Sequence, residues 1–138
     1  PPRSTLFPYT TLFRSAVNVG GVSFMFTGDM EIAGWNKILS NGDLQSALAE
    51  TEIYFASHHG RASGCSEGVF DFCRPKFVVI SDKSKGFQSQ ETTDWYGART
   101  IGGIVNWSRD KRKVLTTRND GNLVFDIKAG ATYDVMKF

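Results

Sequence analysis

Residues 22–29 read VSFMFTGD, and residues 53–60 read IYFASHHG. Each stretch is a short apolar run typical of a β-strand, and each ends in polar residues and a glycine that predict a turn. Between them, a segment with apolar side chains three or four positions apart predicts one helical face over 31–39: Ile32, Trp35, Ile38 and Leu39. The order strand, helix, strand predicts an α/β unit.

The rest of the chain continues this alternation. The run FVVI at 77–80 predicts a strand that is buried on both faces. Two Gly-containing turns predict hairpins: one within 17–26 at Gly20-Gly21, and one joining strands 113–117 and 122–127 at Asp120-Gly121. The other expected elements are helices over 44–50, 67–73 and 92–103 and a last strand over 133–136.

The composition bounds the class of protein. The chain has 138 residues, of which 41% are hydrophobic and 22% charged. These values fit one folded domain, or part of one, and exclude a disordered tail. No run of about 18 apolar residues occurs, so the chain as given contains no membrane segment. The cytoplasm is the favoured location, although a signal peptide or membrane domain could have been lost upstream of residue 16. The oligomeric state is open.

Residues 5–15 read TLFPYTTLFRS, which resembles the in-frame translation of a short-read sequencing adapter. A match over this length is specific. We therefore interpret residues 1–15 as an adapter-derived artefact that is not native, and set them aside as one sets aside a fusion scar. The native chain then begins near Ala16 without its true N-terminus, and the domain to be explained is 16–138.

The charge gives no direct argument for a nucleic-acid partner. The formal net charge is +2, from 16 Lys and Arg against 14 Asp and Glu, and Arg3 and Arg14 lie in the adapter-like segment. Without these two residues the balance is 14 against 14, or zero. One local basic cluster is either a phosphate-binding group or a solvated turn: Arg109, Lys111, Arg112 and Lys113.

Asp29 is the first candidate functional residue. An apolar strand delivers its carboxylate into a turn where Gly28 removes side-chain bulk. A carboxylate there can bind a metal ion, and its two oxygens can bridge two ions. Gly-Asp is also ordinary turn chemistry, so a turn or helix-capping Asp before Glu31 is the alternative.

The two histidines of the chain are adjacent, at His58 and His59. Successive residues of a strand point to opposite faces, so both can reach one site only if the chain has already turned. Imidazole binds Zn²⁺, Fe²⁺ or Mn²⁺, and Gly60 lets the backbone pass close to a ligand. A pair of ordinary loop histidines is the alternative.

The ordered set of a TGD strand end, an HHG turn and a late hairpin with a DG turn resembles the metallo-β-lactamase fold. The likeness is greatest to the competence-type hydrolases and covers about Val17 to Ile127. It implies an α/β fold that is the C-terminal half of an αββα sandwich, truncated at its N-terminus. The family's main signature, HxHxDH, lies upstream of the TGD strand and does not occur in this chain.

The resemblance implies a role for several residues. Asp29 would bind metal, commonly as a bridge between two ions, and the HHG turn would supply a histidine ligand. His58 is favoured because it stands directly at the strand end, with His59 as second choice. The ions would be zinc, or manganese or iron. Arg61 stands where the family has a serine, which changes the substrate contacts at the turn.

Asp82 follows the buried strand 77–80, and ligands gather at such strand ends. Asp82 and Arg61 are therefore candidates for contact with the substrate. The alternative for Asp82 is an ordinary turn residue. The resemblance places the catalytic residues upstream of residue 16. It implies a metal-dependent hydrolase acting on a phosphodiester, such as nucleic acid, or a related bond, and a fragment that is inactive alone because zinc needs about three to four protein ligands. The alternative is a non-catalytic or degenerate α/β binding module, in which Asp29 and the histidines point apart.

Overall fold

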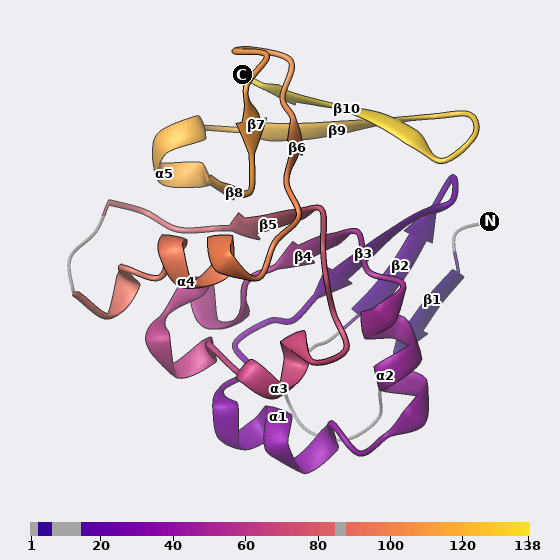
Figure 1. The fold of residues 1–138 in the computed structure, drawn as a ribbon, viewed down its shortest axis with the longest axis vertical. Helices are drawn as coiled ribbons and strands as arrows, with labels where there is room; N and C mark the ends of the chain where they lie inside the picture. Colours follow the sequence, from indigo (N-terminus) through magenta and orange to yellow (C-terminus); the bar gives the residue numbers. More distant parts are fainter. Residues whose placement is uncertain (1–2, 7–14, 85–87) are drawn as a thin grey trace.

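A six-stranded sheet forms the middle layer of the protein. The computed structural model describes residues 3–6, 15–84 and 88–138. Figure 1 shows helices on one side of the sheet and a long two-stranded hairpin on the other. In order across the sheet, the strands are β1 (Arg3–Leu6), β2 (Ser15–Val19), β3 (Val22–Phe26), β4 (Ile53–Phe55), β5 (Phe77–Ile80) and β8 (Val114–Thr116).

Four neighbouring strands, β3, β4, β5 and β8, run parallel, and β2 joins β3 antiparallel through the predicted turn at Gly20-Gly21. The carboxyl ends of parallel strands lie at one edge of a sheet. That edge therefore carries both the TGD sequence after β3 and the HHG sequence after β4. β5 is buried at every position, which confirms the prediction for the FVVI run.

Helices cover the face of the sheet to which Met25, Tyr54, Val78 and Ile80 contribute. Asn41 separates the first two helices, and its side chain caps the second by accepting the Leu44 amide at 2.9 Å. The helices of this layer are α1 (Ile32–Ile38), α2 (Gly42–Ala49), α3 (Glu67–Phe70) and α4 (Thr93–Ala98).

The helix predicted over 92–103 ends at Ala98, earlier than expected. The chain leaves the helix because its next amides find partners elsewhere: Ile101 donates to the Pro75 carbonyl at 2.9 Å, and Gly102 to the Lys76 carbonyl at 3.0 Å. It then forms a short antiparallel pair, β6 (Gly103–Ile104) with β7 (Lys111–Arg112).

The opposite face of the sheet is covered by β9 (Leu123–Lys128) and β10 (Thr132–Lys137), which pair antiparallel. Phe125 of β9 packs edge-on against Phe24 of β3, with 5.9 Å between ring centroids. Phe77 and Val79 face this layer, whereas Val78 and Ile80 of the same strand face the helices. The alternation follows from the strand period of two.

The predicted hairpin at Asp120-Gly121 is wrong. β8 pairs with β5, and β9 turns into β10 around Gly130 and Ala131. Residues 117–120 form a helical turn, α5 (Thr117–Asp120). The buried Asp120 carboxylate accepts the Thr116 amide at 2.9 Å and lies 3.2 Å from the Arg112 guanidinium. These contacts fix a helical turn and override the local preference of the Asp-Gly pair.

The first strand, β1, lies in the segment 1–15 and pairs with β2, most of which lies beyond that segment. The edge of a sheet offers unpaired N–H and C=O groups to any extended segment. The pairing therefore does not bear on the origin of residues 1–15, which stays a prediction. Within the described ranges, no helix is long and apolar enough to cross a bilayer. The predicted α/β class is confirmed by the mixed sheet and its helices.

Replacing Asp120 by Ala should destabilise the fold. The change leaves the Thr116 amide and the Arg112 guanidinium without their carboxylate, which should lower the free energy of unfolding by about 2–3 kcal/mol. Urea denaturation measures the difference. Asp120→Asn keeps the shape and one acceptor oxygen and should cost less. Equal stability of Asp120→Ala and the parent chain would contradict this account of the turn.

Candidate metal centre

The TGD turn is tied to the neighbouring strand at its first residue. Thr27 is buried, and its hydroxyl donates to the Phe55 carbonyl at 2.7 Å, which joins the end of β3 to the end of β4. Gly28 has φ of 58°, a left-handed conformation that glycine adopts without a Cβ penalty. The chain reverses there, and the Asp29 side chain emerges 59% exposed.

The HHG turn is strained in its backbone. His58 and His59 have φ of 50° and 55°, and Gly60 has φ of 70°. A left-handed conformation costs a non-glycine residue roughly 1–2 kcal/mol. The His58 amide donates to the Gly28 carbonyl at 2.9 Å, so the strained turn lies directly against the TGD turn. Such strain persists only where the surroundings impose it, and it is concentrated at functional sites.

Buried polar contacts on both sides of the HHG turn hold its left-handed conformation. The Trp35 indole N–H donates to the Ser57 hydroxyl at 3.1 Å, and the Tyr54 hydroxyl lies 3.3 Å from the same oxygen. Thr92 donates its hydroxyl proton to the Gly60 carbonyl. The residues on both sides of the two histidines are thereby anchored to α1, β4 and the start of α4.

His59 points its Nε2 atom at Asp29. Nε2 lies 3.4 Å from Asp29 Oδ1, and Nδ1 lies 2.8 Å from the Ser81 carbonyl oxygen. A carbonyl can only accept, so Nδ1 carries the proton in this hydrogen bond. In the neutral ring, Nε2 then presents its lone pair toward the carboxylate. A histidine that donates Nδ1–H to a carbonyl and keeps Nε2 open has the arrangement common among metal ligands.

His58 belongs to a different pair. Its Nδ1 lies 3.1 Å from Glu31 Oε1 and 2.9 Å from the Ser63 hydroxyl oxygen. The strand pattern favoured His58 over His59 as the ligand, but the structure places His59 beside Asp29. Strand alternation fails as a guide here because both histidines already lie in a left-handed turn. The identity of the ligand stays a prediction, and the geometry favours His59.

The described part of the chain brings two candidate metal ligands together here, Asp29 and His59. Within residues 3–6, 15–84 and 88–138, no three His, Cys, Asp or Glu side chains converge as a metal site would require. A tetrahedral zinc site takes about three to four protein ligands. Asp29 and His59 therefore fit a metal ion as part of a site, with the remaining positions open to solvent or to other residues.

A pocket of about 370 Å³ adjoins His59. Its lining residues are His59, Arg61, Ser81, Asp82, Lys83 and Gln90. Both residues predicted to contact substrate, Arg61 and Asp82, thus lie beside the candidate ligand. Lys83 adds a second cation that the sequence analysis did not single out, and the two positive charges favour an anionic occupant.

The Asp82 side chain is nevertheless only 1% exposed. Its carboxylate is paired with Arg118, which is also buried, and its backbone exchanges two hydrogen bonds with the Thr117 hydroxyl, at 2.8 and 2.7 Å. Asp82 Oδ1 has no hydrogen-bond partner among the described residues. Asp82 anchors the wall of the pocket to α5, and direct contact with substrate stays a prediction.

Glu31 and Ser81 were missed as contributors. Glu31 lies two residues beyond Asp29 at the start of α1, and a second carboxylate so close to the first was a signal available in the sequence. The Ser81 contact is made through its carbonyl, so the residue type carries no signal for it.

Replacing Gly60 by Ala should destabilise the HHG turn. A Cβ at this position would lie 2.7 Å from Ile80 Cγ2, and φ is already in the left-handed region. We expect the free energy of unfolding to fall by about 2–4 kcal/mol in urea denaturation. Gly42→Ala is the matched control, because nothing lies within 4 Å of a Cβ there. In α2 that change should be neutral or stabilising by up to about 1 kcal/mol. Equal effects of the two substitutions would refute the strain.

The case for a function of this chain rests on the geometry of its described residues. The central facts are the pairing of Asp29 with His59 and the cationic pocket beside it. No family model, curated protein or solved structure matches this chain.

Proposed function

We propose that this chain is part of a metal-dependent hydrolase of the metallo-β-lactamase fold, of the competence type, acting on a phosphodiester or a related bond. The proposal assigns Asp29 and His59 as two of the metal ligands. The single observation that supports it is the distance of 3.4 Å between Asp29 Oδ1 and His59 Nε2 at the carboxyl edge of the parallel strands.

That separation has the right size for one shared ion. Zinc binds imidazole nitrogen and carboxylate oxygen at about 2.0–2.2 Å, so two ligands on one tetrahedral ion lie about 3.4 Å apart. The Ser81 carbonyl holds the His59 ring in the tautomer that such a ligand needs. Zinc is the preferred ion, and manganese or iron would accept the same donors.

The residues of this chain would divide the work at the site. A bound divalent ion supplies Lewis acidity and lowers the pKa of water that it holds. Asp29 offsets the charge of the ion, and His59 orients it from the strained turn. Arg61 and Lys83, which line the adjoining pocket, would attract a substrate with a negatively charged group. The described residues bring no third such ligand to this place, and we place the further metal ligands upstream of Ala16.

Metal binding tests the assignment of ligands. Cobalt(II) should bind the chain weakly, since two protein ligands leave the other positions to water, and its visible absorption should change as protein ligands replace water. Asp29→Asn and His59→Asn should each weaken binding at least about tenfold. His58→Asn is the matched control, because Asn tolerates a left-handed backbone, and it should leave cobalt binding unchanged.

Other outcomes would redirect the proposal. Loss of cobalt binding in His58→Asn alone would move the ligand to His58. An absence of cobalt binding, together with a loss of stability in Asp29→Asn, would identify the pair as a structural ion pair. The binding-module alternative would then hold.

Recovery of the gene upstream of the Ala16 codon tests the hydrolase itself. An in-frame HxHxDH sequence should precede residue 16, and the extended protein should hydrolyse bis(p-nitrophenyl) phosphate in a reaction abolished by Asp29→Ala. The chain described here should show no hydrolysis by itself. An upstream frame without those histidines, or hydrolysis by this chain alone, would overturn this part of the proposal.

A further inference from the structure

A second pocket lies at the opposite edge of the sheet from Asp29 and His59. It has a volume of about 430 Å³, which is in the range of small-molecule sites. It adjoins Phe77 at the start of β5, whereas the first pocket adjoins Ser81 just beyond its end. The cationic, polar and apolar side chains that line it include Lys76, Ile104, Asn106, Arg109, Lys111 and Tyr133.

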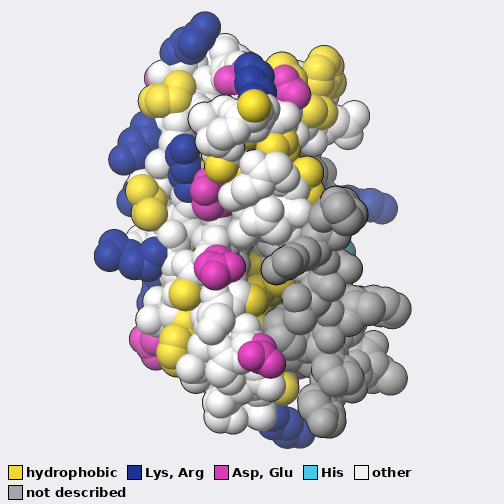
Figure 2. Space-filling model, turned by 90° about the vertical axis from the view of Figure 1, so that its right-hand side faces the viewer, with side chains coloured by type: hydrophobic (Ala, Val, Ile, Leu, Met, Phe, Trp, Pro, Cys, Tyr) yellow, Lys and Arg dark blue, Asp and Glu magenta, His cyan; other side chains and the backbone are white. Residues whose placement is uncertain are grey.

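Cations outnumber carboxylates around this pocket. Lys76, Arg109 and Lys111 line it and form no ion pair with any described residue. The one acidic residue among the described lining residues, Asp134, is already bonded to a further cation, Lys128. Asp134 also interacts electrostatically with Arg109, and Glu52 with Tyr133, so these two carboxylates offset part of the charge and the lining keeps a net positive charge. Figure 2 shows Lys and Arg side chains concentrated along one edge of the visible face.

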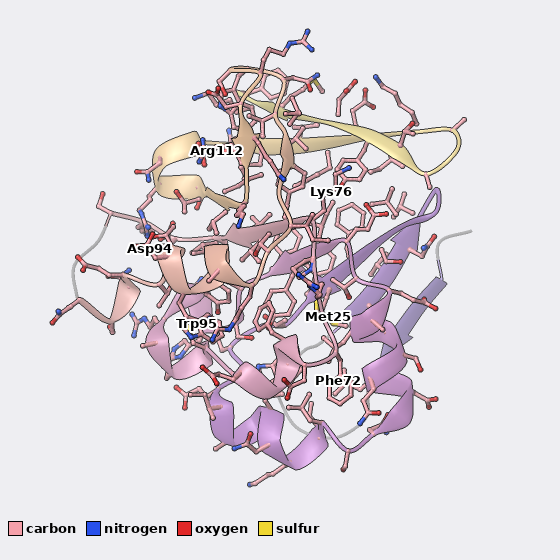
Figure 3. All side chains as sticks on the ribbon, in the orientation of Figure 1. Met25, Phe72, Lys76, Asp94, Trp95 and Arg112 are labelled. Carbon is pink, nitrogen blue, oxygen red and sulfur yellow. The ribbon has the colours of Figure 1, made fainter. Side chains whose placement is uncertain are left out.

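The basic cluster at 109–113 divides into two pairs of residues with different surroundings. Arg112 is held by Asp120, and Lys113 donates to the Gly97 carbonyl at 3.1 Å. The side chains of Arg109 and Lys111 form no hydrogen bond or ion pair with a described residue, although the Asp134 carboxylate interacts electrostatically with Arg109. Both residues line the pocket. Figure 3 shows Arg112 beside the α5 region and Lys76 beneath the β9–β10 pair. The sequence left a phosphate-binding group and a solvated turn as alternatives, and the structure separates the residues that remain available to a ligand.

Arg109 is held in an unusual backbone conformation. Its φ is 61°, a region that arginine rarely adopts, and its amide donates to the Val105 carbonyl at 3.0 Å in the loop between β6 and β7. Glycine or asparagine would fit this position with less strain. Strain at a charged residue that lines a pocket is an observation from which a functional role can be inferred.

The walls of the pocket add an apolar surface. The Lys76 ammonium lies 5.0 Å from the centroid of the Tyr133 ring, and the Ile104 side chain is exposed. Gly103 packs so closely on Phe77 that a Cβ would lie 2.6 Å from Phe77 Cζ, so the backbone at Gly103 lies directly against this ring. The pocket thus combines cationic groups with an aromatic ring and an aliphatic side chain.

We propose that this pocket binds a small organic phosphate of nucleotide size. Its phosphate would lie among Lys76, Arg109 and Lys111, where charge-assisted hydrogen bonds to oxygen are strong. Its apolar or aromatic body would lie against Tyr133 and Ile104. Lysine and arginine bind phosphate as a point charge and a planar fork, respectively, so the set provides both kinds of contact. This site is independent of the proposed metal centre and needs no metal ion.

The test is a titration of the chain with ADP in the presence of EDTA. Binding is monitored by the chemical shifts of the backbone amides in NMR spectra. Gly102, Ile104 and Lys111 should shift, with saturation near about 1 mM ADP or below. Inorganic phosphate should bind more weakly, and adenosine should not compete. Arg109→Gly should weaken ADP binding at least about tenfold while leaving stability equal or higher, because glycine relieves the left-handed strain. Lys37→Gln is the control, since it removes one positive charge from α1.

Three outcomes would overturn the proposal. The first is an absence of ADP binding under these conditions. The second is binding that Arg109→Gly and Lys37→Gln weaken equally, which would show general charge attraction. The third is binding of a single-stranded oligonucleotide at these amides without any binding of ADP, which would assign the surface to a polyanion. None of these depends on Asp29 or His59, so the failure of this site and of the metal centre are distinguishable.

Discussion

The hydrogen bond from the His58 amide to the Gly28 carbonyl joins the two loops on which the candidate metal centre depends. Parallel pairing brings the ends of β3 and β4 to one edge, but it does not decide where the side chains beyond those ends will point. The left-handed turn at His58 and His59 does, because it swings the second ring back over Asp29. A chain that simply continued β4 would carry the two rings to opposite faces.

The strain of that turn is balanced by contacts formed when the rest of the domain folds. Ser57 receives the Trp35 indole from α1 and lies beside the Tyr54 hydroxyl, and Thr92 at the start of α4 holds the Gly60 carbonyl. The position of His59 is therefore a property of the folded domain rather than of the peptide IYFASHHG. A change in the packing of Trp35 would reach the site through Ser57, which accepts its indole N–H and directly precedes the two histidines.

How far the sequence predicts the structure depends on whether the signal is local. Hydrophobic patterning indicated α1 and the buried β5, because burial on one or both faces leaves a pattern within a few residues. The glycine pair at Gly20-Gly21 indicated the hairpin between β2 and β3, because turn chemistry is also local. The Asp120 turn and the pairing of Asp82 with Arg118 could not be predicted, since each depends on partners brought by the fold. The convergence of the TGD and HHG turns was predictable from strand order. Which of the two adjacent histidines lies beside Asp29 was not predictable, because the left-handed backbone of the turn decides it.

The two pockets lie at opposite ends of the same strand, β5. From Phe77 to Ser81 an extended chain covers about 13 Å, which exceeds the screening length of about 8 Å at physiological ionic strength. Charges in one pocket therefore act only weakly on a ligand in the other. Coupling between them would have to pass through β5 itself, whose side chains are fixed in the cores on both faces. A closely packed strand of this kind transmits a shift only if both cores rearrange, so the two pockets should bind their ligands independently.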